Sequence, residues 1–571
     1  MHDLVIRAGT LIDGTGRPGR VCDLGIDGRE IAALGGDVGP GRREIDAAGL
    51  LVTPGWVDVH THYDGQVTWD PYLSPSSWHG VTTVVMGNCG VGFAPVRPGA
   101  AGFLMELMEG VEDIPEAVLT EGMPWNWETF AEYLDVVDGI DRAIDVAAQV
   151  GHCAVRAYVL GERAHDTAVT ADEIAQMRRI TREALEAGAV GFSTSRTILH
   201  TSKHGLVPGT FSSPEELLGI SGALGDAGHG VFELLNDQMG DDPDLGWMRE
   251  FCETTGRALT FTFAQRGDPA RPFAETLREM ERLRQEGLDI WPQVACRAPG
   301  LLFGLQGSMN PFAGHPTFLK MAGLPIGEKA AELRKPDVRE KLLSEDSLLA
   351  AVMPEEIRKN ILEAWDLMYR LGDPPDYEPL PTSSAAAVAA REGRRPEEVV
   401  LDWLAADDGR DFVYRPLGNY SDGNLDAVHD MLVNPNTVIG LSDGGAHVGL
   451  ICDASMPTYL LSYWARDRVR GERIPIETVV RKQTAETARL YGFDDRGVLA
   501  PGMKADVNVI DLERLHIHAP EQVHDLPAGG SRLVQRVDGY RATICSGEVI
   551  FEDGRPTGAL PGKLIRGGAA A

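Results

Sequence analysis

Short apolar runs alternate with amphipathic helical stretches through the middle of the chain. Eight of the runs read as buried strands, and helical patterns such as 171–187 and 273–286 lie between several of them. Apolar strands that alternate with helices indicate a parallel sheet. Eight such units predict a closed (β/α)8 TIM barrel, with the active site at the carboxyl ends of the strands. The predicted strands are 57–60, 83–86, 155–158, 191–193, 230–233, 259–262, 290–293 and 438–441.

The two ends of the chain have a different pattern. Residues 1–54 and 498–571 contain short β runs separated by glycines, which predicts that both ends form one small composite β-sandwich domain. The barrel then occupies 55–497. About 140 residues separate its seventh and eighth strands, where a barrel unit needs about 30. We therefore predict that 300–425 forms an inserted helical subdomain on the catalytic face.

Charge and cysteine usage narrow the class of protein. The 571 residues carry a formal net charge of −32, which disfavours nucleic acid and anionic membrane surfaces as partners. The seven cysteines are scattered and never form a C-x-x-C pair, which favours a reducing compartment. The first residues lack a basic region followed by a long apolar run, so we predict a cytoplasmic protein. Oligomeric state stays open, although acidic barrels of this kind often associate into homo-oligomers.

The strongest local motif is the H-x-H pair His60 and His62 at the end of the first predicted strand. Residues i and i+2 of a strand lie on the same side, so the two imidazoles project together into the barrel mouth. Two neutral imidazoles at this spacing suit Zn²⁺ or a similar divalent ion. The alternative is a pair of polar loop histidines, which the preceding apolar strand disfavours.

Four sequence blocks resemble the amidohydrolase superfamily and, within it, the N-acyl-D-amino-acid deacylase (D-aminoacylase) group. The resemblance covers nearly the whole chain. The blocks are 51–62 with the H-x-H pair, Gly87-Asn88-Cys89-Gly90, Leu441-Ser442-Asp443-Gly444, and 497–506 at the return to the β-sandwich. The block around Cys89 points to the deacylase group in particular.

The resemblance implies a role for each matched residue. His60 and His62 are expected to be metal ligands. Cys89 is expected to be a thiolate ligand in place of the carbamylated lysine of other branches. Asp443 is expected to lie beside the metal and to act as the general base, taking a proton from water and passing it to the leaving amine.

The sequence departs from the deacylase pattern at the fifth and sixth strands, where that pattern has a histidine at each strand end. Neither 231–236 nor 260–265 contains one. Glu233 or Gln265 could replace them as oxygen ligands. The position that uses the H-x-H pair, the cysteine and the aspartate is intact. We therefore predict one divalent ion per chain, zinc by preference, at the site of His60, His62 and Asp443, with Cys89 beside it.

Several residues near the predicted strand ends are candidates for substrate binding. Arg196, Arg266 and Arg297 each follow a strand, and arginine binds carboxylates in a bidentate manner. Tyr63 follows the H-x-H pair, and His447 lies four residues after Asp443. Each of these residues could equally have a purely structural role.

The leading hypothesis is hydrolysis of the C–N amide bond of an N-acyl-D-amino acid or a related small amide. A second enzymatic interpretation is a hydantoinase-like hydrolase of cyclic amides or imides. A third, from another class, is a catalytically decayed protein that binds a small molecule. The intact set His60, His62, Cys89 and Asp443 disfavours decay, and the metal content of the purified protein separates that interpretation from the two enzymatic ones.

Overall fold

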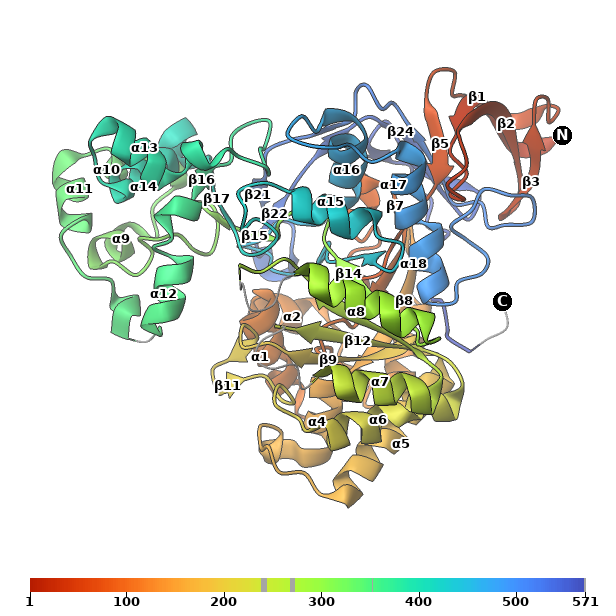
Figure 1. The fold of residues 1–571 in the computed structure, drawn as a ribbon, viewed down its shortest axis with the longest axis horizontal. Coiled ribbons are helices and arrows are strands. Elements are labelled where there is room, and N and C mark those ends of the chain that lie inside the picture. Colours follow the sequence, from red (N-terminus) through yellow and green to blue (C-terminus); the bar gives the residue numbers. More distant parts are fainter. Residues whose placement is uncertain (238–243, 268–272, 352, 569–571) are drawn as a thin grey trace.

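The structure is a computed structural model and describes residues 1–237, 244–267, 273–351 and 353–568 (Figure 1). Among them, eight parallel strands follow one another around a single sheet, in the order β6-β7-β8-β9-β12-β13-β14-β18. A backbone bridge between Thr61 and Gly444 joins the segments that follow the first and last strands. The predicted parallel eight-stranded architecture is confirmed. The strands are β6 (Trp56–Asp58), β7 (Val81–Met86), β8 (Asp145–Gly151), β9 (Gly191–Arg196), β12 (Val231–Asn236), β13 (Ala258–Phe263), β14 (Ile290–Val294) and β18 (Val438–Ile439).

The predicted third strand was wrong. Residues 155–158 belong to helix α4 (His152–Leu160), and the third position in the sheet is taken by β8 (Asp145–Gly151). All seven residues of β8 are buried, but Ala147, Ala148 and Gln149 carry little β propensity. The β-branched Val155 and the aromatic Tyr158 gave a stronger local signal in a segment that the fold makes helical.

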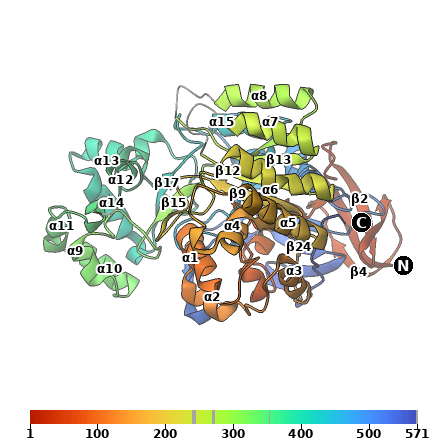
Figure 2. The same ribbon diagram turned by 90° about the horizontal axis from the view of Figure 1, so that it is seen from below.

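Helices cover the outside of this sheet, as Figures 1 and 2 show. The ends of these helices carry the usual capping residues. Helix α5 begins with a capping box between Thr170 and Glu173 and ends at Gly188 in the left-handed region. The connection between β7 and β8 is longer and holds three helices. The helices around the barrel are α1 (Ala101–Glu112), α2 (Glu116–Gly122), α3 (Phe130–Asp138), α4, α5 (Ala171–Ala187), α6 (Pro214–Ala227), α7 (Asp244–Thr255), α8 (Phe273–Gln285), α15 (Asp426–Val433), α16 (Met456–Tyr459), α17 (Ile476–Gln483) and α18 (Ala485–Leu490).

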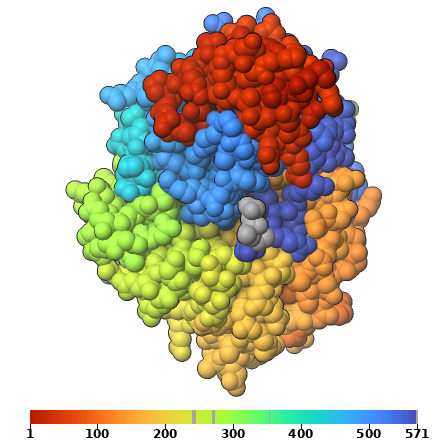
Figure 3. Space-filling view, turned by 90° about the vertical axis from the view of Figure 1, so that its right-hand side faces the viewer, coloured from red at the N-terminus to blue at the C-terminus, as the bar shows by residue number. Residues whose placement is uncertain are grey.

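The two chain ends meet in one nine-stranded sheet of the described residues. Strand β5 pairs with β19, so that Pro54 lies opposite Val507. In the space-filling view of Figure 3, the red N-terminal residues lie directly against blue residues from late in the chain. The division at 54/55 and 497/498 stays a prediction. The strands are β1 (His2–Leu11), β2 (Arg20–Asp27), β3 (Glu30–Gly35), β4 (Gly41–Asp46), β5 (Leu51–Pro54), β19 (Val507–Ile510), β24 (Tyr540–Cys545), β25 (Glu548–Glu552) and β26 (Arg555–Pro556).

A buried ionic cluster joins this sheet to the barrel. Asp145, at the start of β8, accepts a hydrogen bond of 2.6 Å from Arg496 and lies 3.0 Å from the Nζ of Lys504. Burial by itself would raise the pKa of Asp145, but Lys504 and Arg496 outweigh it and hold the pKa below its ordinary value.

Most of the segment between β14 and β18, from β15 (Gly300–Phe303) to β17 (Val413–Pro416), forms a lobe that stands apart from the N-terminal sheet in Figures 1 and 2. It combines helices with a three-stranded sheet, β15-β17-β16. No helix in the described part of the chain is long and apolar enough to cross a membrane. The elements of the lobe are β15 (Gly300–Phe303), α9 (Pro316–Met321), α10 (Ile326–Leu333), α11 (Pro336–Leu342), α12 (Glu355–Ile361), β16 (Tyr369–Arg370), α13 (Ala385–Glu392), α14 (Pro396–Leu404) and β17 (Val413–Pro416).

Candidate metal centre

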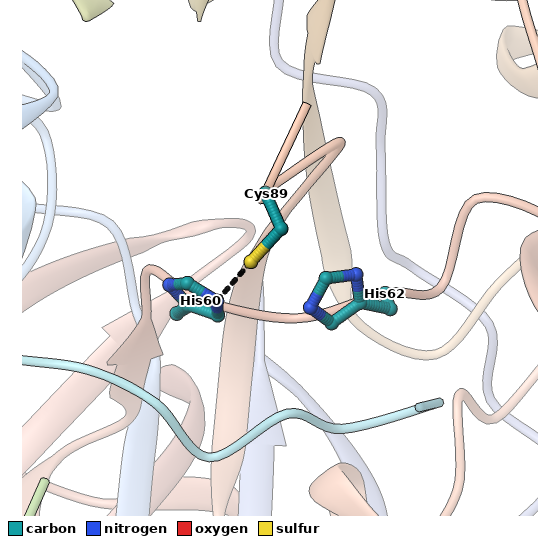
Figure 4. Close-up of side chains that lie close together, drawn as sticks. All are labelled: His60, His62 and Cys89. Carbon is teal, nitrogen blue, oxygen red and sulfur yellow. Dashed lines mark hydrogen bonds between the residues drawn. The ribbon is translucent and has the colours of Figure 1, made fainter. Parts of the chain in front are cut away.

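The two histidines of the H-x-H pair follow β6 and lie side by side, with ring centroids 5.5 Å apart. Both are almost fully buried, at 1% and 2% exposure. His60 Nδ1 lies 2.5 Å from the side-chain oxygen of Gln293 on β14, and its Nε2 lies 3.2 Å from Cys89 Sγ (Figure 4). Gln293 therefore occupies one edge of the His60 ring and leaves the other edge to the centre.

Cys89 reaches the histidines because the turn after β7 is unusually tight. Gly87, Cys89 and Gly90 all have positive φ angles, of 81°, 57° and 74°. A Cβ on Gly87 would lie 2.2 Å from the carbonyl oxygen of Gln149, and one on Gly90 would lie 2.8 Å from the backbone nitrogen of Ser195. The glycines on either side are thus required for the close approach that aims the thiol.

Asp443 comes to the same point from β18. Its Oδ1 lies 3.4 Å from His60 Nε2 and 3.8 Å from His62 Nε2. Two backbone hydrogen bonds hold it there: the Asp443 N–H donates to the His60 carbonyl (3.2 Å), and the His62 N–H donates to the Gly444 carbonyl (2.8 Å). The backbone contacts that join the segment after β18 to the segment after β6 therefore also bring Asp443 to the two histidines.

The donor atoms of His60, His62 and Cys89 all lie within 4.8 Å of one another. Burial lowers the pKa of His60 to about 4 and that of His62 well below its usual value, so both rings are neutral and offer lone pairs. Burial also raises the pKa of the Cys89 thiol and of the Asp443 carboxyl. A donor set of neutral imidazoles, a thiol and a carboxyl fits a divalent ion, whose charge would stabilise the thiolate and the carboxylate.

Other buried groups flank the centre, and two of them were not predicted. Glu112, at the end of α1, places Oε1 3.1 Å from His62 Nδ1. His200, in the segment after β9, is 8% exposed, and its pKa is lowered by burial and by His447 and His60. An acidic residue in an amphipathic helix and a histidine in a polar loop carry no local signal that separates them from surface residues.

The two residues considered as replacement ligands behave differently. Glu233 Oε2 accepts a hydrogen bond of 2.8 Å from the Cys89 backbone N–H, and burial raises the pKa of this carboxyl to about 8. Gln265 instead bonds to the segment before α15, because its Nε2 donates to Asp422 at 2.6 Å. Glu233 thus adjoins the centre, whereas the amide of Gln265 is bound to Asp422.

The five residues predicted to bind substrate differ in how deeply they are buried. The Tyr63 hydroxyl is buried and donates to Ser76 (2.7 Å). Arg297 is 1% exposed and pairs with Asp453 at 2.8 Å. Both therefore use their polar groups inside the fold.

The other three lie nearer to solvent. Arg196 donates to the Ser212 carbonyl at 2.8 Å. The Arg266 side chain is 44% exposed and lies 3.6 Å from Asp237. The His447 side chain is 22% exposed, with Nε2 3.5 Å from Glu112 Oε2. His447 is therefore linked to the metal-ligand candidates through Glu112, which lies beside both His447 and His62.

Known proteins resemble this chain over its whole length. A D-aminoacylase of Alcaligenes xylosoxydans xylosoxydans is 29% identical over 582 residues, covering 100% of this chain and 98% of that protein. An N-acyl-D-glutamate deacylase of the same organism is 27% identical over 573 residues, covering 99% and 96%. An uncharacterised protein of Mycobacterium tuberculosis (strain ATCC 25618 / H37Rv) is 29% identical over 588 residues, covering 97% and 92%.

Solved structures share the fold. A D-aminoacylase crystal structure superposes with a TM-score of 0.64 at 23% identity and covers 99% of this chain and 100% of its own. An N-acyl-D-glutamate deacylase from Bordetella bronchiseptica, complexed with zinc and a phosphonate inhibitor, gives 0.64 at 24% identity, covering 99% of each chain. Residues 43–551 match the sequence profile described as the amidohydrolase family, and this chain belongs to that family.

Proposed function

We propose that this protein hydrolyses the amide bond of an N-acyl-D-amino acid, using one divalent ion, zinc, held by His60, His62 and Cys89 with Asp443 beside it. The observation that carries the proposal is the convergence of three donor atoms within 4.8 Å from two separate strand ends. The full-length similarity to two D-amino-acid deacylases supports the substrate class. The zinc complex of the similar deacylase supports the choice of ion.

The residues of the centre divide the chemistry between them. A bound divalent ion supplies Lewis acidity that makes a water more acidic and polarises a carbonyl. His60 and His62 contribute neutral Nε2 donors, and Cys89 contributes sulfur. Asp443 accepts the proton of the attacking water and delivers it to the amide nitrogen as the C–N bond breaks, which releases a carboxylic acid and a free amine.

The substrate's own carboxylate needs a cation at the rim. Arg266 follows β13, and its side chain is 44% exposed, so it remains accessible to a ligand. A bidentate contact between this guanidinium and a carboxylate would orient the amide toward the centre. His447, with 22% of its side chain exposed, is the second residue that we propose as a substrate contact.

Metal analysis and a substrate panel test the proposal. We expect about one zinc per chain, and faster hydrolysis of N-acyl-D-amino acids than of their L forms, hydantoins or imides. Asp443→Asn should lower kcat by about 10²–10⁴-fold. Asp430→Asn, at an exposed position of α15, is the matched control and should not change it. A protein that takes up no metal, or that leaves every amide intact, would overturn the proposal.

A further inference from the structure

The C-terminal end of α1 (Ala101–Glu112) reaches the centre from outside the barrel strands. Glu112, its last residue, has 0% exposure. Its two carboxylate oxygens face two different histidines: Oε1 lies 3.1 Å from His62 Nδ1, and Oε2 lies 3.5 Å from His447 Nε2. One carboxylate therefore spans a metal-ligand candidate and a proposed substrate contact.

This position is energetically unfavourable for a carboxylate. The C-terminal end of a helix carries partial negative charge, and the last turn of α1 contains no basic residue. Neither oxygen of Glu112 has a well-aligned hydrogen-bond partner among the described residues. A buried acid without such compensation destabilises a fold, so a contribution to stability does not account for its position.

The end of α1 also anchors the loop that carries His447. The Glu112 carbonyl accepts a hydrogen bond of 3.3 Å from the Val448 N–H. Next along the chain, Asp113 Oδ2 accepts from the Gly449 N–H (3.1 Å) and from the Ser308 hydroxyl (2.8 Å). The carbonyl of Glu112 and the side chain of Asp113 therefore both bind the loop after β18.

We propose that Glu112 is a positioning residue that holds His62 and His447 in one arrangement. Its Oε1 keeps the proton of His62 on Nδ1, which directs the Nε2 lone pair to the ion and makes the ring a stronger donor. Its Oε2 receives the Nε2–H of His447. These contacts would come into hydrogen-bonding alignment through a rotation about the last side-chain torsion of Glu112, which is broad for glutamate. This inference rests on the metal site proposed above.

Metal affinity tests the first half of the proposal, by competition with a chromophoric zinc chelator. Loss of a partner that orients a ligating histidine costs about 10–100-fold in metal affinity, which we expect for Glu112→Ala. Glu112→Gln retains an acceptor oxygen and should lose less, so it serves as the conservative rescue if the alanine variant folds poorly. Glu109→Gln, on an exposed position of the same helix, is the matched control and should bind zinc like the wild type.

A double-mutant cycle with His447→Ala tests the second half, with kcat/KM as the readout. If Glu112 acts on His447, the effect of Glu112→Ala should shrink at least about threefold in the His447→Ala background. Unchanged zinc affinity in both Glu112 variants, or additive effects in the cycle, would overturn the inference while leaving the proposed function standing. Absence of zinc binding in the wild type would overturn both.

Discussion

Replacing Gln293 with leucine should weaken metal binding without disturbing the barrel. Gln293 lies on β14, fully buried, and its side-chain oxygen is 2.5 Å from His60 Nδ1. Its amide packs against Gly440, the residue after β18, since a Cβ on Gly440 would lie 2.4 Å from Gln293 Cδ. Leucine has a similar volume and keeps this packing. The substitution therefore removes one acceptor and little else.

The size of the effect follows from that single contact. A buried donor left without an acceptor costs about 1–3 kcal/mol. Loss of an orienting partner of a ligating histidine costs about 10–100-fold in metal affinity, which is about 1.4–2.7 kcal/mol. The two ranges agree, so we expect the zinc dissociation constant of Gln293→Leu to rise between about 10- and 100-fold.

Competition titration against a chromophoric chelator measures this change directly. Gln483→Leu is the matched control. Gln483 is also buried, at 4% exposure, and its Nε2 also has no hydrogen-bond partner among the described residues, but it lies on α17. The control should bind zinc like the wild type. An affinity of Gln293→Leu within about twofold of the wild type would refute the claim that Gln293 orients His60.

Three further predictions concern the framework and the ion. Asp145→Asn removes a carboxylate that faces two buried cations; because Lys504 keeps Asp506, the loss should be near the lower end for a broken buried pair, about 3 kcal/mol. The folded-state pKa of Asp145 is depressed to about 2, so its contribution is present above the unfolded pKa and is lost as the pH falls through the folded one. The difference in unfolding free energy between the two proteins should begin to shrink below about pH 5 and disappear only below about pH 2. Gly90→Ala places a Cβ 2.8 Å from the Ser195 nitrogen at a φ of 74°. It should lower the free energy of unfolding by about 1–3 kcal/mol in chemical denaturation and lower the zinc affinity. A variant with unchanged stability and affinity would show that the turn relaxes freely. Chelation of the metal should abolish hydrolysis and lower Tm, because a free ion at 100 times its Kd adds about 2.7 kcal/mol to the free energy of unfolding. Added zinc should restore both activity and Tm. Activity that survives exhaustive chelation would contradict this prediction.

The barrel was predictable where strands are rich in β-branched and aromatic residues. The apolar run before His60 and the run that became β7 gave the correct elements. The failure at β8 has a specific cause: alanines and a glutamine are buried there by the surrounding strands, not by their own propensity. Whether such a segment forms a strand depends on its packing against neighbouring strands, and the local pattern of one sequence does not contain that information.

The centre was predictable as far as its residues lie in recognisable blocks. His60, His62, Cys89 and Asp443 were expected to converge, and each has a donor atom within 3.8 Å of another member of the set. The supporting residues were not expected. Glu112 comes from a helix in the unusually long connection between β7 and β8, and only the path of that helix through space brings it to His62.

Glu233 shows why a carboxylate at the fifth strand does not imply a second ion. Its Oε2 already accepts the Cys89 N–H at 2.8 Å, and its Oε1 lies 3.8 Å from His60 Nδ1. That is the ring edge opposite Nε2, which faces Cys89 and Asp443. Glu233 therefore lies behind His60 as seen from the proposed ion.

A stoichiometry measurement distinguishes a supporting carboxylate from a ligand. Glu233→Gln keeps an oxygen that can accept the Cys89 N–H, so we expect the variant to bind the same amount of zinc per chain as the wild type, by elemental analysis after dialysis. A fall from two zinc ions in the wild type to one in the variant would identify Glu233 as a ligand of a second ion. Since its free oxygen lies on the Nδ1 side of His60, the geometry favours the first result.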